Sequence, residues 1–254
     1  METNPFSLAG RTALVTGGAT GLGFAISKCL SRAGATVVAA GTRTPEQAAG
    51  DLAGLGPGVA YRRFDVTDAG GARDFVAGVG EEFGTVTILV NNAGVHCKKP
   101  IEEMTPEDFS RVLEVHLVGA FALTRAAVPA MKAKGGGSVI FQASLTSFIG
   151  QPFIAGYSAA KAGILGLVHT LASELGASGI RVNAIAPGWI ETPMFHQATD
   201  NDAPRLAKIL GRIPMKKTGR PDDVGMAAVF LAGEAAKYIN GVCLPVDGGA
   251  LIGF

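Results

Sequence analysis

Short apolar segments alternate along this chain with segments patterned as helices, and few folds accommodate that alternation. The apolar segments predict strands at 12–15, 36–40, 61–64, 86–90, 138–142, 181–186 and 242–246. Helical patterns lie between them at 22–33, 45–54, 69–83, 106–133, 155–177 and 221–232. Repeated strand–helix–strand crossovers place helices on both faces of a parallel sheet. The sequence therefore predicts an α/β fold, a single domain over residues 1–254 with a doubly wound, seven-stranded parallel sheet flanked by helices.

Charge balance and cysteine content argue against several classes of function. Lys and Arg number 22 and Asp and Glu number 21, so the net charge of +1 gives no broad field for nucleic acid or an anionic membrane. The cysteines, 3 in all, lack the spacing of a disulfide framework or a zinc site. Residues 1–10 lack the pattern of a secretory signal. We therefore expect a cytoplasmic protein with no metal, no membrane partner and no nucleic-acid partner.

A glycine-rich turn, Thr16-Gly17-Gly18-Ala19-Thr20-Gly21-Leu22-Gly23, follows the first predicted strand and leads directly into a helix. Such a turn lets backbone N–H groups approach a phosphate, and the helix N-terminus adds partial positive charge. An ordinary tight turn is the alternative, but the position in the first strand–helix unit favours a dinucleotide site. The predicted cofactor contacts in this turn are Gly17, Thr20, Gly21, Leu22 and Gly23.

The end of the second predicted strand bears on the choice of cofactor. An acidic residue there holds the ribose 2′-hydroxyl of NAD, but this chain reads Gly41-Thr42-Arg43. Arg43 is available to pair with a 2′-phosphate, and no carboxylate at this position repels it. The sequence therefore favours NADP(H), contacted by Thr42 and Arg43, while NAD stays possible.

Further motifs follow the later strands in a fixed order. After the glycine-rich turn come Asp65-Val66, Asn91-Asn92-Ala93-Gly94, Ser144, Tyr157-Ser158-Ala159-Ala160-Lys161 and Pro187-Gly188. From about Gly10 to Gly249 this ordered set resembles the short-chain dehydrogenase/reductase family. The resemblance implies a Rossmann fold, NAD(P)-dependent chemistry at a CH–OH group and a homotetramer.

The resemblance also implies roles for individual residues. Tyr157 is expected to be the general acid/base, Lys161 to bind the nicotinamide ribose as well, and Ser144 to orient the carbonyl or alcohol. Asp65 and Val66 are expected at the adenine, and Ile190 and Thr192 at the carboxamide. The remaining implied cofactor contacts are Asn92, Ala93, Gly94, Pro187 and Gly188.

The chemistry of the Tyr157 motif can also be argued from the residues themselves. Tyr157 and Lys161 are four positions apart on a predicted helix, so they share a face. A cation within about 4–6 Å lowers the pKa of a tyrosine by about 1–3 units, which favours proton exchange near neutral pH. The Ser144 hydroxyl can hydrogen-bond the substrate oxygen. We therefore expect a proton-transfer site beside a nicotinamide.

His116 departs from the family pattern. It stands on a long predicted helix where the family usually has an Asn that steadies a water joined to the lysine. In one interpretation, His116 belongs to a proton relay, titrates near 6.5 and acts as a fourth catalytic residue. The alternative is a helix histidine packed against strands. The two interpretations are equally favoured.

The sequence also bears on alternative activities and on the substrate. Ser158-Ala159-Ala160-Lys161 and Lys217-Thr218-Gly219 match signatures of serine β-lactamases, but Lys217-Thr218-Gly219 precedes a helix start and not a strand as the signature requires. A non-catalytic NADP(H)-binding regulator is a second alternative. Among substrates, resemblance to the gluconate 5-dehydrogenase and 2-deoxygluconate 3-dehydrogenase branch suggests a polyol or sugar acid. Reductases of 3-oxoacyl carrier protein share most of the same motifs.

Two further segments carry predictions about the substrate and about assembly. The proline-containing region 187–220 is predicted to be irregular and to form a substrate-binding lid. The apolar end 250–254 predicts a subunit contact, because such a patch is rarely left in water. We therefore expect a homo-oligomer.

Overall fold

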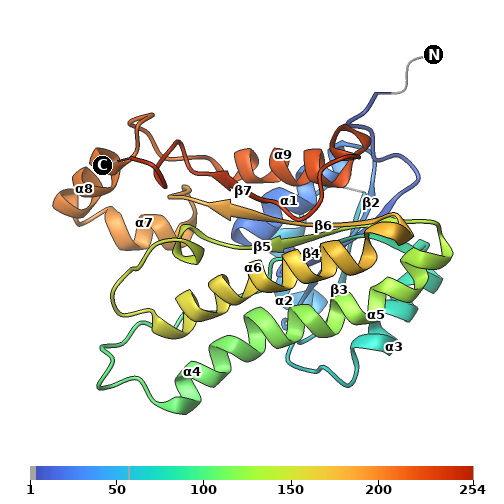
Figure 1. The fold of residues 1–254 in the computed structure, drawn as a ribbon, viewed down its shortest axis with the longest axis horizontal. Coiled ribbons are helices and arrows are strands. Elements are labelled where there is room, and N and C mark those ends of the chain that lie inside the picture. Colours follow the sequence, from blue (N-terminus) through green and yellow to red (C-terminus); the bar gives the residue numbers. More distant parts are fainter. Residues whose placement is uncertain (1–3, 57, 254) are drawn as a thin grey trace.

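The computed structural model describes residues 4–56 and 58–253 and contains the predicted parallel sheet (Figure 1). Neighbouring strands pair in parallel, in the order β3-β2-β1-β4-β5-β6-β7. The predicted doubly wound α/β fold is therefore confirmed. The strands are β1 (Thr12–Thr16), β2 (Thr36–Gly41), β3 (Val59–Arg63), β4 (Val86–Asn91), β5 (Gly137–Gln142), β6 (Ile180–Pro187) and β7 (Cys243–Val246).

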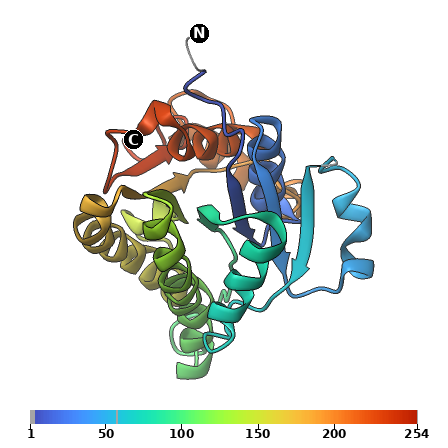
Figure 2. The same cartoon turned by 90° about the vertical axis from the view of Figure 1, so that its right-hand side faces the viewer.

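Helices cover both faces of the sheet, as Figure 2 shows. One apolar cluster packs α3 (Ala72–Phe83), α5 (Gly119–Ala133) and α6 (Ala155–Leu175) against one face. A second cluster packs α1 (Gly21–Arg32) and α9 (Pro221–Ala232) against the other. Burial on both faces explains why central strands such as β1 and β5 are buried at every position and not at alternate ones.

The strand order reverses around β1, and this reversal positions the site. The chain runs from β1 outward to β2 and β3, and then returns to β4 on the other side of β1. In open parallel sheets, loops leave the carboxyl ends of such strands in opposite directions and open a crevice between them. The turns after β1 and β4 meet at this crevice.

The long helix predicted at 106–133 is interrupted in the structure. It consists of α4 (Pro106–Leu113), the π-helical turn η1 (Glu114–Val118) and α5. The whole run is long and apolar enough to span a membrane by length and composition, but side chains such as Leu123 and Met131 are fully buried in the core. A π-turn inside an α-helix often marks a functional position, and His116 lies on this one.

The prediction that region 187–220 is irregular is wrong. It contains α7 (Pro193–Thr199) and α8 (Ala203–Arg212). Each helix has a proline in its first turn and a side-chain cap, because Thr192 accepts from the Phe195 N–H and Asp202 accepts from the Arg205 N–H. Proline favours a helix start, where its missing N–H costs nothing. The prolines of this region therefore mark helix starts.

Candidate active site

The turn between β1 and α1 has the shape that its glycines predict. Gly17 and Gly21 have φ angles of +62° and +52°, a backbone region that other residues rarely adopt. A Cβ on Gly23 would lie 2.1 Å from the Gly17 carbonyl oxygen, so the helix can start this close to the strand only with glycine there. Among the described residues the Thr20 side chain makes no capping hydrogen bond to α1. The first N–H groups of α1 are therefore left without this side-chain cap, an arrangement that fits a phosphate.

Asn92, at the end of β4, holds this turn against its neighbour. Its side-chain amide donates to the Thr16 carbonyl oxygen at 2.9 Å. In return the Thr16 hydroxyl accepts from the backbone N–H groups of Asn92 and Ala93, both at 3.0 Å. These hydrogen bonds join two predicted parts of the site, the glycine-rich turn and the Asn92 segment, and the two segments together form one wall of the crevice.

A cavity of about 720 Å³ opens beside this wall. Its volume lies within the roughly 300–1,000 Å³ typical of small-molecule sites. Of the predicted cofactor contacts, it brings together Gly17, Thr42, Asp65, Val66, Ala93 and Gly94. Residues that line it without having been predicted include Phe64, Thr67, Val95, Arg111 and Glu114.

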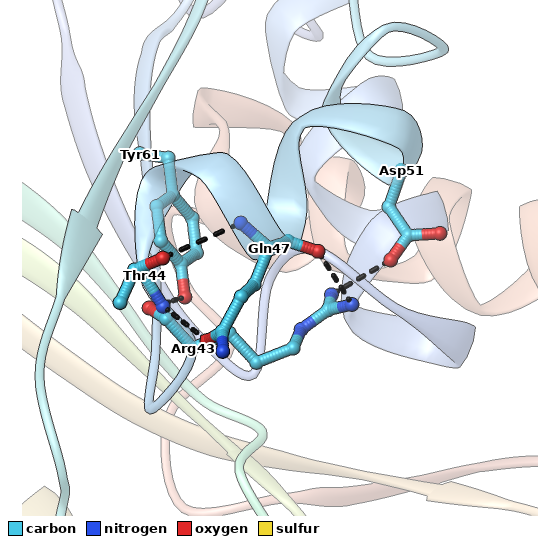
Figure 3. Close-up of polar contacts among 5 residues, drawn as sticks. All are labelled: Arg43, Thr44, Gln47, Asp51 and Tyr61. Carbon is cyan, nitrogen blue, oxygen red and sulfur yellow. Dashed lines mark hydrogen bonds and ion pairs between the residues drawn. The ribbon is translucent and has the colours of Figure 1, made fainter.

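Arg43 is not among the residues that line this cavity. Figure 3 shows its side chain directed toward Asp51. Its guanidinium lies 2.7 Å from the Asp51 carboxylate, on the last turn of α2 (Pro45–Leu52), and also donates to the Gln47 carbonyl oxygen at 3.4 Å. The backbone of Arg43 is fixed by the Tyr61 hydroxyl, which donates to its carbonyl oxygen at 2.9 Å. The guanidinium must therefore leave Asp51 to meet a 2′-phosphate at Thr42.

The predicted contacts after β6 lie at the same end of the sheet. The Gly188 N–H donates to the Val246 carbonyl oxygen of β7 at 3.0 Å, directly after Pro187. Ile190 is buried and forms an isolated bridge with Gly219. The Thr192 hydroxyl is occupied as the cap of α7. These residues do not line the 720 Å³ cavity, so the cavity covers only part of the predicted cofactor surface.

Ser144, Tyr157 and Lys161 come together as the sequence predicts. Ser144 follows β5, and Tyr157 and Lys161 lie one turn apart at the start of α6. The Lys161 ammonium group lies 5.5 Å from the centre of the Tyr157 ring and donates a short hydrogen bond to the Gln142 carbonyl oxygen. The Ser147 hydroxyl, next to the turn η2 (Leu145–Ser147), donates to the Lys161 carbonyl oxygen at 2.7 Å. Loop and helix are thus tied together around the phenol.

The expected lowering of the Tyr157 pKa is wrong for this structure. Burial raises the pKa of Tyr157 above its usual value, and a hydrogen bond with Ser144 only partly opposes this shift. Burial also lowers the pKa of Lys161 to about 7. A lysine that is partly neutral at pH 7 acidifies its neighbour less than a permanent cation does, so sequence spacing alone overestimates the effect.

His116 does not titrate near 6.5 as expected. Its pKa is lowered to about 3, first by burial and then by the charge of Lys161. Its Nε2 lies 3.0 Å from the Val95 nitrogen and 2.8 Å from the Val95 oxygen, whereas its Nδ1 has no hydrogen-bond partner among the described residues. The ring also meets Tyr157 edge-on, with ring centroids 5.2 Å apart.

Sequence reasoning missed His96. Its ring stacks on Tyr157 with centroids 4.3 Å apart and an angle of 24° between the planes. Burial, followed by the charge of Lys161, lowers the pKa of His96 below its usual value. Only its position directly after the Asn92 segment hinted at a site role, because stacking on a residue 61 positions later leaves no periodic signal.

Comparisons with known proteins agree with this geometry. The family model described as "Enoyl-(Acyl carrier protein) reductase" matches residues 17–250. A 2-dehydro-3-deoxy-D-gluconate 5-dehydrogenase of Pseudoalteromonas atlantica is 39% identical over 247 residues, which cover 96% of this chain and 97% of that protein. The 3-oxoacyl-[acyl-carrier-protein] reductase FabG of Thermotoga maritima is 35% identical over 247 residues, covering 96% of this chain and 99% of that one.

A solved structure is similar over nearly its whole length. It is a gluconate 5-dehydrogenase from Burkholderia cenocepacia in complex with NADP and tartrate. The TM-score is 0.90 at 33% sequence identity, and the match covers 97% of each chain.

Proposed function

Because the chain belongs to the short-chain dehydrogenase/reductase family, whose members are oxidoreductases acting on CH–OH groups, we propose that it interconverts a secondary alcohol and a ketone with NADP(H). The observation that carries this proposal is the convergence of Ser144, Tyr157 and Lys161 at the carboxyl end of the sheet. A polyol or sugar acid is the proposed substrate.

The residues act on the substrate oxygen. NADP(H), when bound, supplies or accepts the hydride. In reduction the Tyr157 hydroxyl donates its proton to the substrate oxygen, and in oxidation it takes that proton back. The Ser144 hydroxyl hydrogen-bonds the same oxygen. Lys161, with its pKa near 7, exchanges a proton readily at neutral pH and is held beside the phenol by the Gln142 carbonyl oxygen.

The proposed choice of NADP(H) rests on the end of β2. The segment Gly41-Thr42-Arg43 has no carboxylate, and Thr42 lines the cavity, whereas the Arg43 guanidinium pairs with Asp51 and would have to turn to reach a 2′-phosphate. The solved relative from Burkholderia cenocepacia also contains NADP. The Thr20 and Leu22 backbone, together with Asn92 and Gly94, would hold the rest of the cofactor.

The proposed substrate class rests on two relatives. One is a sugar-acid dehydrogenase that matches nearly the whole chain, and the other holds tartrate, a hydroxylated acid. Residues 187–220 would act as a lid on the one predicted domain, with α7 and α8 over the substrate. Reduction of a 3-oxoacyl thioester is the second candidate, favoured by the 35% identity to FabG.

An absorbance assay of NADPH separates these possibilities. The purified protein is given NADP⁺ with polyols and sugar acids, and NADPH with oxo-sugar acids and 3-oxoacyl thioesters. We expect turnover with the hydroxylated acids. Turnover with thioesters alone would replace the substrate proposal, and NADPH binding without turnover on the whole panel would favour a non-catalytic regulator.

We also propose a homotetramer in the cytoplasm. On the helical run through η1 and α5, Val118 and Phe121 are 38% and 45% exposed, an apolar surface suited to a second copy. In the C-terminal segment Ala250 is buried against α8, whereas Ile252 is 80% exposed; Phe254 lies outside the described residues. The free thiols of Cys29, Cys97 and Cys243 suit a reducing compartment. Sedimentation at micromolar concentration tests the assembly, and a monomer there would contradict it.

A further inference from the structure

Two histidine rings contact the phenol ring of Tyr157. One is His96, at the end of the segment Gly94-Val95-His96, and the other is His116, which hydrogen-bonds Val95 in the same segment. His96 stacks on the face of Tyr157, and His116 meets the same ring edge-on at an angle of 90°. The two histidines come from different elements, the loop after β4 and the turn η1. The Tyr157 phenol thus has one stacked and one perpendicular ring contact.

His116 also fixes the loop that carries His96. Its Nε2 is within hydrogen-bond distance of both backbone polar atoms of Val95, so one of the two bonds forms in either tautomer. The ring fits because residue 94 is glycine, where an added Cβ would lie 2.3 Å from the His116 Cε1 atom. The hydrogen bond therefore sets the position of Val95, and Val95 sets the position of the next residue, His96.

We propose that His116 is a positioning residue that acts through Val95 to hold the His96 ring flat on Tyr157, so that His96 orients the phenol and shields it from water. This inference rests on the proposed function, because it assigns the phenol its proton-transfer role. In this proposal His116 affects Tyr157 through the loop after β4 and does not pass protons as a relay would. Its chemistry needs no charge on either histidine.

The structure favours positioning over a relay for a simple reason. A relay needs a ring nitrogen that passes a proton on, and one of the two, Nε2, is engaged with the Val95 backbone. A positioning role needs only the fixed geometry that is present. The two roles differ in one measurable respect, which is whether the effect of His116 depends on His96.

A double-mutant cycle measures that dependence. The variants are His116→Phe, which keeps a ring but loses the bond to Val95, His96→Ala, and the pair together. We expect each single change to lower kcat by about two- to tenfold, the scale of one aromatic contact. The double variant should lose no more than the worse single variant, with NADPH affinity unchanged in all three. Losses that multiply would overturn the proposal.

Two further variants sharpen the result. His96→Phe keeps a stacked ring and should recover most of the kcat lost in His96→Ala, whereas equal losses in both would overturn a role for stacking. His169→Ala, at an exposed position on α6, is the matched control. If thermal unfolding shows that His116→Phe is not folded, His116→Asn takes its place in the cycle with the same expected coupling.

A measurement that needs no substrate turnover distinguishes a failure of this inference from a failure of the proposed function. The Tyr157 phenol is titrated by ultraviolet absorbance, assigned by difference from Tyr157→Phe, since the chain has only 3 tyrosines. The groups that face it are Lys161, Ser144, His96 and His116. Both His96→Ala and His116→Phe should move its pKa down toward the ordinary value, because each admits water. No shift with His116→Phe would overturn the proposal, even if the enzyme turned over no substrate tested.

Discussion

Replacing Arg43 tests how the chain would distinguish NADP(H) from NAD(H). In the structure the guanidinium pairs with Asp51 at 2.7 Å, and both side chains are partly exposed (Figure 3). An exposed ion pair contributes about 0–1 kcal/mol. A hydrogen bond to a charged group contributes about 1.5–3 kcal/mol. A 2′-phosphate at Thr42 should therefore displace Asp51 and gain the difference, about 0.5–3 kcal/mol.

The two partners of this ion pair should act in opposite directions. Arg43→Ala should weaken NADPH binding about 2- to 150-fold, and Asp51→Asn should tighten it by up to about fivefold, because Arg43 is then free. NADH lacks the 2′-phosphate, so its Kd should stay constant in both variants. Arg62→Ala is a matched control, since Arg62 pairs with Glu82 elsewhere on the surface.

Fluorescence titration of NADPH and NADH gives the dissociation constants of both cofactors for the wild type, the two variants and the control. The reasoning would be refuted if Arg43→Ala changed the two affinities by the same factor or changed neither. Weaker NADPH binding in Asp51→Asn would show that Asp51 supports the site and does not compete for Arg43.

Further predictions concern the glycine-rich turn, Lys161 and His116. Gly23→Ala should weaken NADPH binding by about tenfold or more, because the new Cβ would lie 2.1 Å from the Gly17 carbonyl oxygen, while Gly78→Ala, with nothing within 4 Å, should not. The pKa of Lys161 falls to about 7 on folding, so the unfolded chain binds more protons above that pH. The free energy of unfolding, measured in urea, should therefore rise from pH ~7 to ~10 relative to Lys161→Met, and parallel curves would contradict this. Because the pKa of His116 is about 3, His116→Asn should leave the limbs of the pH–rate profile between about pH 5 and 8 in place, and a lost limb there would restore the relay.

Much of the fold could be predicted because burial on both faces leaves a strong local signal. Each predicted strand overlaps an observed one, since uninterrupted apolar runs such as the one in β4 occur where helices cover both faces. The two helices of region 187–220 escape prediction because proline usually interrupts regular structure. The caps Thr192 and Asp202, each directly before a proline-containing first turn, carried the opposite signal.

The sequence predicted that Tyr157 and Lys161 are neighbours, but it did not predict the geometry of the candidate site or the place of His96 in it. Helical spacing placed Tyr157 beside Lys161, yet burial, which raises the pKa of one and lowers that of the other, depends on the whole fold. The direction of Arg43 depends on Asp51, eight positions later on α2. The stacking of His96 on Tyr157 joins the loop after β4 to α6, which only the folded sheet brings together. No rule of sequence spacing predicts such contacts between residues of different elements.

The central claim is that Tyr157 exchanges a proton with the substrate while NADP(H) is bound. Single-turnover oxidation of NADPH by Tyr157→Phe, with NADPH affinity measured on the same sample, tests it most directly. We expect the rate to fall by about 10²-fold or more while the affinity stays within about twofold of the wild type. A Tyr157→Phe variant that binds NADPH normally and turns over at the full rate would contradict it.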